Sequence, residues 1–266
     1  MTEQEHPILQ NNSSINVYKQ SAFLIANRLK WDLNPLSWSS RKRLKKIKNS
    51  HLGEKAVIVC NGPSLLQTDF SLLEGVYTFG LNKINLLFDR EDFRPNAIVS
   101  VNPLVIEQNK SFYEETSIPL YLDSDASKVI TKGKDVTFLH SSHQVKFARD
   151  VSMSIWQGAT VTNVALQLAF HMGFKHVAVI GCDHNFAESG SANKVVTSTE
   201  KDNSHFDPRY FAGGVKWQLP DLPTSEFGYN LAKENFEASG RFVYNCTVGG
   251  KLEVFSRISL NDFVKL

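Results

Sequence analysis

Short apolar runs that stop abruptly at a polar residue are the feature that most limits how this chain can fold. Four such runs, each with the polar residue that follows it, are Ala56–Cys60 with Asn61, Val76–Leu81 with Asn82, Ala97–Val101 with Asn102, and His176–Gly181 with Asp183 beyond Cys182. Continuous apolar runs of this length are typical of strands buried on both faces of a parallel sheet. Ligands bind at the carboxyl ends of such strands, so the four polar residues predict a ligand site there.

Helical segments alternate with these strands. Thr160–Met172 carries apolar residues at helical spacing, and Gly173 is placed to end that helix. The alternation predicts an α/β fold: a Rossmann-like, mostly parallel sheet with helices on both faces. Further expected elements are the strands Pro119–Asp123, Val136–Leu139, Arg241–Cys246 and Leu252–Val254, a short helix from Ser64 to Leu73, and a helix over Phe227–Ser239.

The chain of 266 residues is long enough for one large α/β domain with an appendage. We expect a helical, basic N-terminal arm over residues 1–50 and a single α/β domain over residues 51–266, which contains the predicted ligand site. Residues 184–224 are too rich in Gly, Ser, Asn and Pro to predict regular structure. A loop of that length within a compact domain is usually functional, and we interpret it as a lid.

Charge is unevenly distributed, although the net charge is only +2. Arg41–Lys48 has six cations in eight residues, and Ser21–Trp38 before it is apolar and aromatic. This combination suits either a peripheral membrane contact through residues 21–48 or a packed helix with one solvated basic face. The remainder of the chain has no basic stripe, so no nucleic-acid partner is expected. The oligomeric state stays open.

The sequence predicts a cytoplasmic location. If residues 21–48 contact a membrane, the protein is expected at the inner face of the plasma membrane. No run of eighteen apolar residues occurs, and the N-terminus lacks an apolar signal-peptide core. Cys60, Cys182 and Cys246 lie far apart in apolar stretches, as reduced core thiols do.

The loop Asn61-Gly62-Pro63-Ser64 offers a ligand several groups at once. Gly62 lets the backbone approach closely, Pro63 fixes the turn, and the two polar side chains offer neutral hydrogen bonds. Backbone amides at the start of the following helix favour a phosphate. A plain strand-to-helix turn is the alternative. Because no Gly-Lys-Ser/Thr follows, the segment is not a Walker loop.

Two further segments are candidates for chemistry. Gly158-Ala159-Thr160 opens the clearest helix, where it suits either close approach of an anionic group or an ordinary N-cap by Thr160. His205, in the polar stretch, is the best candidate for a general base, with His184 as a second and a merely solvated histidine as the alternative. No metal site is predicted, because the spacing of Asp183, Asp202 and Asp207 requires none.

Taken together, these segments resemble the bacterial sialyltransferases of glycosyltransferase family 42. In order along the chain they are VIVCNGPSL, GLNKINLLF, SVNPLVIEQ, GATVTNVALQLAFHMGFKHVAVIGCDHNF and DNSHF. The resemblance implies a CMP-sugar donor such as CMP-sialic acid, inversion at the anomeric carbon, and no required metal or other cofactor. It also implies a GT-A-like form of the Rossmann-like fold and a bacterial surface glycan as acceptor.

The resemblance assigns roles to individual residues of this chain. Asn61, Gly62 and Ser64, with Pro63 between them, would hold the donor phosphate and ribose, with Asn82, Asn102 and Asp183 beside them. Gly158, Ala159 and Thr160 would line the cytosine or the donor carboxylate, and His205 would take the proton of the acceptor hydroxyl. The family's phosphate-binding tyrosines are missing after Asp183, and Tyr210, Arg209 or Lys216 could replace them.

The C-terminal third is more similar to a second group, the MptE-like proteins, named after an archaeal 6-hydroxymethylpterin diphosphokinase. That group shares the Gly-Pro-Ser-Leu loop and the Gly-x-Asp strand, here Gly62–Leu65 and Gly181–Asp183. The resemblance implies an ATP-dependent diphosphate transfer that requires Mg²⁺ and acidic ligands. Three functions therefore stay open: a CMP-sugar-dependent glycosyltransferase, such a diphosphokinase, and a non-catalytic nucleotide-binding module of a glycan-assembly complex.

Overall fold

The computed structural model describes residues 16–133, 135–186, 190–198, 201–202 and 204–266. The chain forms two compact units, residues 1–39 and 40–266. Residues 1–15 of the predicted arm lie outside the described residues, as do 187–189, 199–200 and Asn203 of the predicted lid.

The described part of the predicted arm is helical. Helix α1 (Val17–Asp32) begins where the side chain of Asn16 accepts a hydrogen bond from the amide of Lys19. Helix α2 (Pro35–Ile47) begins with proline at its first position, where the missing N–H costs nothing. Asn34 completes that start by accepting a hydrogen bond from the amide of Leu36.

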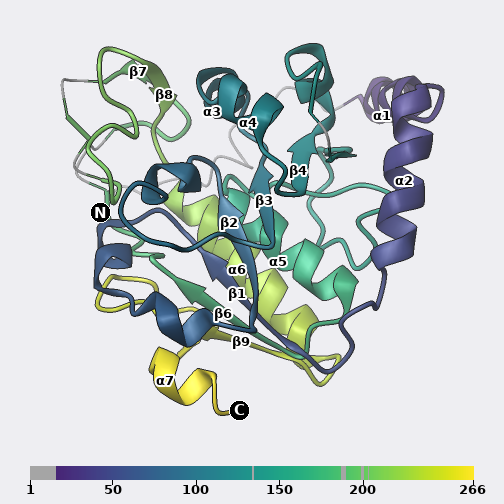
Figure 1. The fold of residues 1–266 in the computed structure, drawn as a ribbon. Helices are drawn as coiled ribbons and strands as arrows, with labels where there is room; N and C mark the ends of the chain where they lie inside the picture. The colour runs from purple at the N-terminus through teal and green to yellow at the C-terminus, as the bar shows by residue number, and fades with distance from the viewer. Residues whose placement is uncertain (1–15, 134, 187–189, 199–200, 203) are drawn as a thin grey trace, which may run out of the picture. The chain divides into compact units, whose positions relative to one another are not determined.

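The second unit is built on one eight-stranded sheet in the order β10-β9-β6-β1-β2-β3-β4-β5 (Figure 1). All neighbouring strands in it are parallel. The strands are β1 (Lys55–Val59), β2 (Tyr77–Leu81), β3 (Ala97–Ser100), β4 (Leu120–Asp123), β5 (Val136–Leu139), β6 (His176–Ile180), β9 (Phe242–Asn245) and β10 (Ser256–Arg257). This sheet, flanked by helices, confirms the predicted α/β, Rossmann-like class.

The strand order creates a switch point beside β1. From β1 the chain proceeds through β2, β3, β4 and β5 on one side, and then returns to place β6 against the other side of β1. In open parallel sheets, the connections diverge at such a point and leave a crevice at the carboxyl ends of the two strands. The residues that follow β1 and β6 are therefore the ones that the topology places at a ligand crevice.

Two long helices, α5 (Val161–Met172) and α6 (Leu222–Glu237), pack against each other and against the sheet. Helix α5 ends where predicted, because Gly173 adopts a φ of 99°, which favours glycine. Helix α6 begins earlier than predicted, because the Asp221 side chain accepts a hydrogen bond from the amide of Thr224 and caps it. Among the described helices, none is both long enough and apolar enough to cross a bilayer.

The remaining elements are short. They are the 3₁₀ turns η2 (Pro63–Gln67), η3 (Phe70–Leu73), η4 (Ile84–Leu87) and η5 (Ser124–Lys128), and the helices α3 (Pro103–Gln108), α4 (Lys110–Glu115) and α7 (Leu260–Phe263). The helix predicted from Ser64 to Leu73 is thus two separate turns, because Asp69 caps a new start with its side chain. Leu252–Val254 is not a strand, and β10 begins beyond it.

The predicted lid region contains some regular structure. Strands β7 (Val195–Thr197) and β8 (Lys216–Gln218) pair antiparallel. A separate cluster of buried residues accompanies them, consisting of Tyr210, Phe211, Trp217 and Leu219 with Val105 of α3. The aromatic residues give this polar stretch a core of its own, which its Gly, Ser and Asn content concealed. Whether the region moves as a lid stays a prediction.

Candidate functional site

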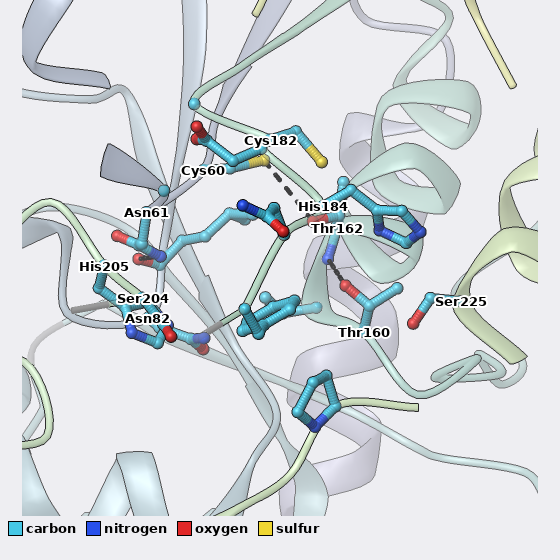
Figure 2. A pocket seen from close by; sticks show the side chains of 18 of the residues that line it. Cys60, Asn61, Asn82, Thr160, Thr162, Cys182, His184, Ser204, His205 and Ser225 are labelled. Carbon is cyan, nitrogen blue, oxygen red and sulfur yellow. Dashed lines mark hydrogen bonds between the residues drawn. The ribbon is translucent and has the colours of Figure 1, made fainter. Parts of the chain in front are cut away.

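A cavity of about 160 Å³ lies at the switch point between β1 and β6. Asn61, Asn82, Ser204 and His205 lie on one side of it, and Thr160, His184 and Ser225 on the opposite side (Figure 2). Seven predicted site residues line it: Asn61, Gly62, Asn82, Ala159, Thr160, Asp183 and His205. Pro63, Ser64, Asn102 and Gly158 are not among the residues that line it.

Asp183 fixes the loop that follows β1. The hydroxyl of Ser64 donates a hydrogen bond of 2.7 Å to Oδ2 of Asp183, and the backbone amide of Ser64 lies 3.3 Å from both carboxylate oxygens. A Cβ on Gly62 would overlap that carboxylate, which explains the glycine. The amide that we expected to bind a phosphate is therefore occupied by a carboxylate of the protein itself.

Asn61 leaves one buried acceptor at the cavity wall. Its Nδ2 donates to the carbonyl of Leu81 at 3.0 Å, while its Oδ1 is buried without a hydrogen-bond partner among the described residues. A buried unpaired acceptor is costly, and the residue that carries it lines the cavity. The backbone carbonyl of Asn61 accepts a hydrogen bond from the amide of Phe206 at 2.8 Å, which brings His205 to this loop.

The other two strand-end asparagines have different positions. Asn82 lines the cavity in a left-handed conformation with a φ of 48°, and its Oδ1 accepts a hydrogen bond from Ser100. Asn102 instead caps α3 by accepting from the amide of Leu104, and its Nδ2 donates to Gln218. The polar residues after β1, β2 and β6 therefore meet at the cavity, whereas the one after β3 serves the neighbouring helix.

The start of α5 shows the N-cap that was one of the two interpretations, and the binding of an anionic group there stays a prediction. The hydroxyl of Thr160 accepts a hydrogen bond from the amide of Thr162 and lies 3.4 Å from the hydroxyl of Tyr229, and Thr160 also lines the cavity. Ala159, beside it, adopts a φ of 56°. A left-handed alanine is strained, and strained residues cluster at functional sites.

His205 forms a dyad with Asp202. Its Nδ1 lies 2.7 Å from Oδ2 of Asp202, and its ring stacks on Tyr210 at 3.9 Å between centroids with only 2° between the planes. Both side chains are nearly buried, with 12% of His205 and 4% of Asp202 exposed. The Nε2 atom has no hydrogen-bond partner among the described residues, so the ring has one nitrogen oriented by the protein and one available at the cavity.

The electrostatics of the dyad favour a charged Asp202. Burial by itself raises the pKa of Asp202, but the hydrogen bonds from His205 and from the backbone amides of Ser204 and His205 outweigh it, and the pKa is lowered overall. Beneath the stacked rings, Lys83 donates to the carbonyl of Tyr210 at 2.6 Å. Burial lowers the pKa of Lys83 to about 8, against the attraction of Asp202.

Two thiols, missed as site residues by the sequence analysis, also line the cavity. Cys60 follows β1, and Cys182 precedes Asp183 after β6. The hydrogen bond with Cys182 and burial raise the pKa of Cys60 well above its usual value, so the thiol is protonated at neutral pH and is a poor nucleophile. All three cysteines are free and buried, as predicted. Their position directly before Asn61 and Asp183 was the available signal.

The three candidates for replacing the phosphate-binding tyrosines of family 42 lie at different positions relative to the cavity. Tyr210 lies under the His205 ring and lines the cavity. Arg209 is engaged by Asp207 and Asp89, and neither it nor Lys216 lines the cavity. His184, the second candidate base, lines the cavity with its Nε2 held 2.9 Å from Oε1 of Glu226.

Charge in the cavity wall is limited. Among the described residues that line it, none is a lysine or arginine, and Asp183 is the one carboxylate. The described part of the chain also contains no group of three His, Cys, Asp or Glu residues placed to hold a metal ion. The chain contains one Asp-x-Asp triplet, a pattern that holds a metal in many sugar transferases, at Asp123-Ser124-Asp125. It lies at the end of β4, where Asp123 accepts hydrogen bonds from Ser141 and Gln157 and Asp125 pairs with Lys128.

Comparison with known proteins agrees with the fold. A solved structure of the MAf glycosyltransferase from Magnetospirillum magneticum AMB-1 is similar, with a TM-score of 0.52 and 16% identity. The match covers 86% of this chain but 39% of that one, and at this identity it shows the fold alone. No curated protein matches. The resemblance to family 42 stays a prediction. The family described as 6-hydroxymethylpterin diphosphokinase MptE-like matches residues 33–189, and not the C-terminal third for which the sequence predicted the likeness. The match covers more than half of the chain, which therefore belongs to the MptE-like family.

Proposed function

We propose that this protein is a nucleotide-sugar-dependent, inverting glycosyltransferase with His205 as its general base. The observation that carries the proposal is the dyad: His205 is oriented by Asp202 through Nδ1 and by the Tyr210 ring, and its Nε2 is available at a cavity on the carboxyl edge of the sheet. A histidine held in this way is suited to accept a proton from a hydroxyl. The likeness in fold to a glycosyltransferase supports this reaction class.

In this proposal the cavity takes the nucleoside part of the donor. The buried, unpaired Oδ1 of Asn61 accepts a hydrogen bond from a hydroxyl or amino group, and Thr160 offers a hydroxyl on the opposite side. Neutral groups of this kind match a ribose or a base better than a phosphate, because no lysine or arginine occurs among the described lining residues. CMP linked to sialic acid or a related nonulosonic acid is the proposed donor, and a bacterial surface glycan the proposed acceptor.

The proposed step requires one proton transfer. The acceptor hydroxyl gives its proton to Nε2 of His205 while its oxygen attacks the anomeric carbon of the donor. The bond from that carbon to the phosphate oxygen breaks, and CMP leaves with the bonding electrons through an oxocarbenium-like transition state. Asp202 stabilises the positive charge that His205 acquires, because its lowered pKa keeps it ionised.

A thermal-shift panel tests the donor class. CMP, CDP, UDP, GDP and ATP are each added with and without Mg²⁺, since a ligand that binds the native state raises the melting temperature. Stabilisation by CMP without metal supports the proposal. Stabilisation by ATP only with Mg²⁺ contradicts it and supports the diphosphokinase alternative, for which transfer of diphosphate to 6-hydroxymethylpterin is the direct assay.

Replacing the base tests the chemistry. His205→Ala is expected to slow CMP release from a CMP-nonulosonic acid by about 10²–10⁴-fold, and to keep the thermal shift produced by CMP. His143→Ala, at an exposed histidine outside the cavity lining, is the matched control and is expected to retain activity. Retained turnover in His205→Ala contradicts the assignment. CMP binding without turnover in the wild-type protein supports the non-catalytic module instead.

A further inference from the structure

The N-terminal segment has a charge opposite to that of the rest of the chain. Residues 16–48 contain nine lysines and arginines and a single acidic residue, Asp32, whereas the whole chain has a net charge of only +2. The remainder is therefore acidic overall. A short segment with most of the excess positive charge is suited to an anionic partner.

Three lysines of α2 are available for such a partner. Lys42, Lys45 and Lys46 lie at spacings of three and four residues, which places them on one face of the helix. All three are exposed, and within the described part of the chain none forms an ion pair. The opposite face is attached to the α/β unit, because Ser40 accepts from the amide of Phe138 and the carbonyl of Leu44 accepts from His171.

Helix α1 presents an apolar stripe. Tyr18, Ile25 and Leu29 lie at i, i+7 and i+11, on one face of the helix, and they are 84%, 60% and 52% exposed. Trp31, the buried residue of α1, lies on the other side of the helix. Large apolar side chains exposed together in this way mark an interaction surface rather than ordinary surface variation.

From these observations we propose that α1 and the lysine face of α2 bind the surface of an anionic lipid bilayer. The apolar stripe of α1 enters the boundary between headgroups and acyl chains, while Lys42, Lys45 and Lys46 attract the anionic headgroups. Two weak contacts on one chain reinforce each other, because the second forms at a high effective concentration.

The charges favour a bilayer over the other occupants. A second copy of α1 would bring Lys19, Arg28 and Lys30 of both helices together, and like charges repel. A nucleic acid would attract the lysines but would leave Tyr18, Ile25 and Leu29 without an apolar phase to enter. An anionic bilayer satisfies both the charge and the apolar stripe.

The test is sedimentation of the full chain with vesicles of phosphatidylcholine alone and of phosphatidylcholine with phosphatidylglycerol. Binding to the mixed vesicles, weakened by salt, is expected. Since each cation near an anionic surface strengthens binding by about fivefold, the triple variant Lys42→Gln, Lys45→Gln, Lys46→Gln is expected to bind about 100-fold more weakly. The matched control neutralises three exposed lysines elsewhere, Lys110, Lys132 and Lys265, and is expected to bind like the wild type.

The apolar stripe is tested separately. Ile25→Ser with Leu29→Ser is expected to reduce vesicle binding at least tenfold without lowering the melting temperature, because both side chains are exposed. Val145→Ser with Leu266→Ser, two exposed apolar residues outside the segment, is the control. Failure of the wild type to bind mixed vesicles overturns the proposal. The proposal is also overturned if a variant and its control lose vesicle binding equally, or if the lysines bind a DNA or RNA duplex more tightly than the vesicles. A dimer that forms through the apolar stripe in ultracentrifugation, without vesicle binding, overturns it as well.

Discussion

The two walls of the cavity are built in different ways. In the wall formed by the strand ends, polar groups form hydrogen bonds within the protein: Asp183 accepts from Ser64, and Asn82 accepts from Ser100. In the wall formed by the loop that contains Asp202 and Tyr210, these two residues orient the ring of His205, and Nε2 of that ring stays available. In the proposed reaction, Asp183 and Asn82 of the strand-end wall support the fold, Asn61 of the same wall offers its unpaired Oδ1 to the donor, and the loop wall supplies the base.

The largest effect should come from the strand-end wall, at Gly62. In Gly62→Ala, the new Cβ overlaps the carboxylate of Asp183 and lies 2.7 Å from the carbonyl of Gly181. Overpacking of this kind is expected to cost about 3 kcal/mol of unfolding free energy, measured by denaturant titration.

A double-mutant cycle identifies the cause. Adding Gly62→Ala to Asp183→Ala should cost less than adding it to the wild type, because the clashing oxygens are gone while the carbonyl of Gly181 remains. Strictly additive effects would show that Asp183 does not constrain Gly62, and the view of this wall as a supporting element would fail.

The next effect belongs to the loop wall. In Asp202→Asn, Oδ1 keeps the amide of Ser204, so the new NH₂ group faces Nδ1 of His205 and donates to it. The ring then keeps its proton on Nε2 and cannot act as a base, so turnover is expected to fall about 100-fold with little change in nucleotide binding. Asp207→Asn, a buried carboxylate of the same loop that bonds Arg209, is the control, because it should change stability more than turnover.

Acid unfolding gives a second measure of Asp202. Its pKa is lowered in the folded protein, so its stabilising contribution is present above the unfolded pKa, near the usual value of 3.8, and is lost as the pH falls through the folded value. Asp202→Asn should therefore lose less melting temperature than the wild type when the pH is lowered below 4. An identical acid profile would show that the dyad does not form.

Lys83 connects the two walls, since it follows Asn82 of β2 and donates to the carbonyl of Tyr210. Burial lowers its pKa from 10.5 to about 8, so between these two values the unfolded chain binds more protons and stability rises with pH. A shift of that size corresponds to roughly 3 kcal/mol across the interval. Lys83→Met is expected to flatten the rise in melting temperature above pH 8, whereas Lys265→Met, at an exposed lysine, should not. An unchanged rise in Lys83→Met would show that the pKa of Lys83 is not lowered in the folded protein.

The two walls also differ in how far the sequence predicted them. Periodicity placed β1, β2 and β6, and the rule for parallel sheets then brought Asn61, Asn82 and Asp183 together. It could not show that Asp183 turns back on Ser64, because that contact joins residues 119 positions apart. Nor could the pattern distinguish Asn102, which caps a helix, from Asn61 and Asn82, which line the cavity. His205 was identified by residue type, but its partner Asp202 and the Tyr210 stack depend on a loop whose aromatic core no local pattern announces.

The smallest effect decides between the two interpretations of Thr160. Its hydroxyl accepts from the amide of Thr162, so Thr160→Ala is expected to cost about 1 kcal/mol as a lost N-cap, or about 2 °C in melting temperature for a domain of this size. Thr160→Ser keeps the oxygen and should restore stability. If Thr160 only caps α5, the thermal shift caused by the preferred nucleotide is the same in both variants. If that shift disappears in Thr160→Ala and returns in Thr160→Ser, the start of α5 binds the ligand as well as capping the helix.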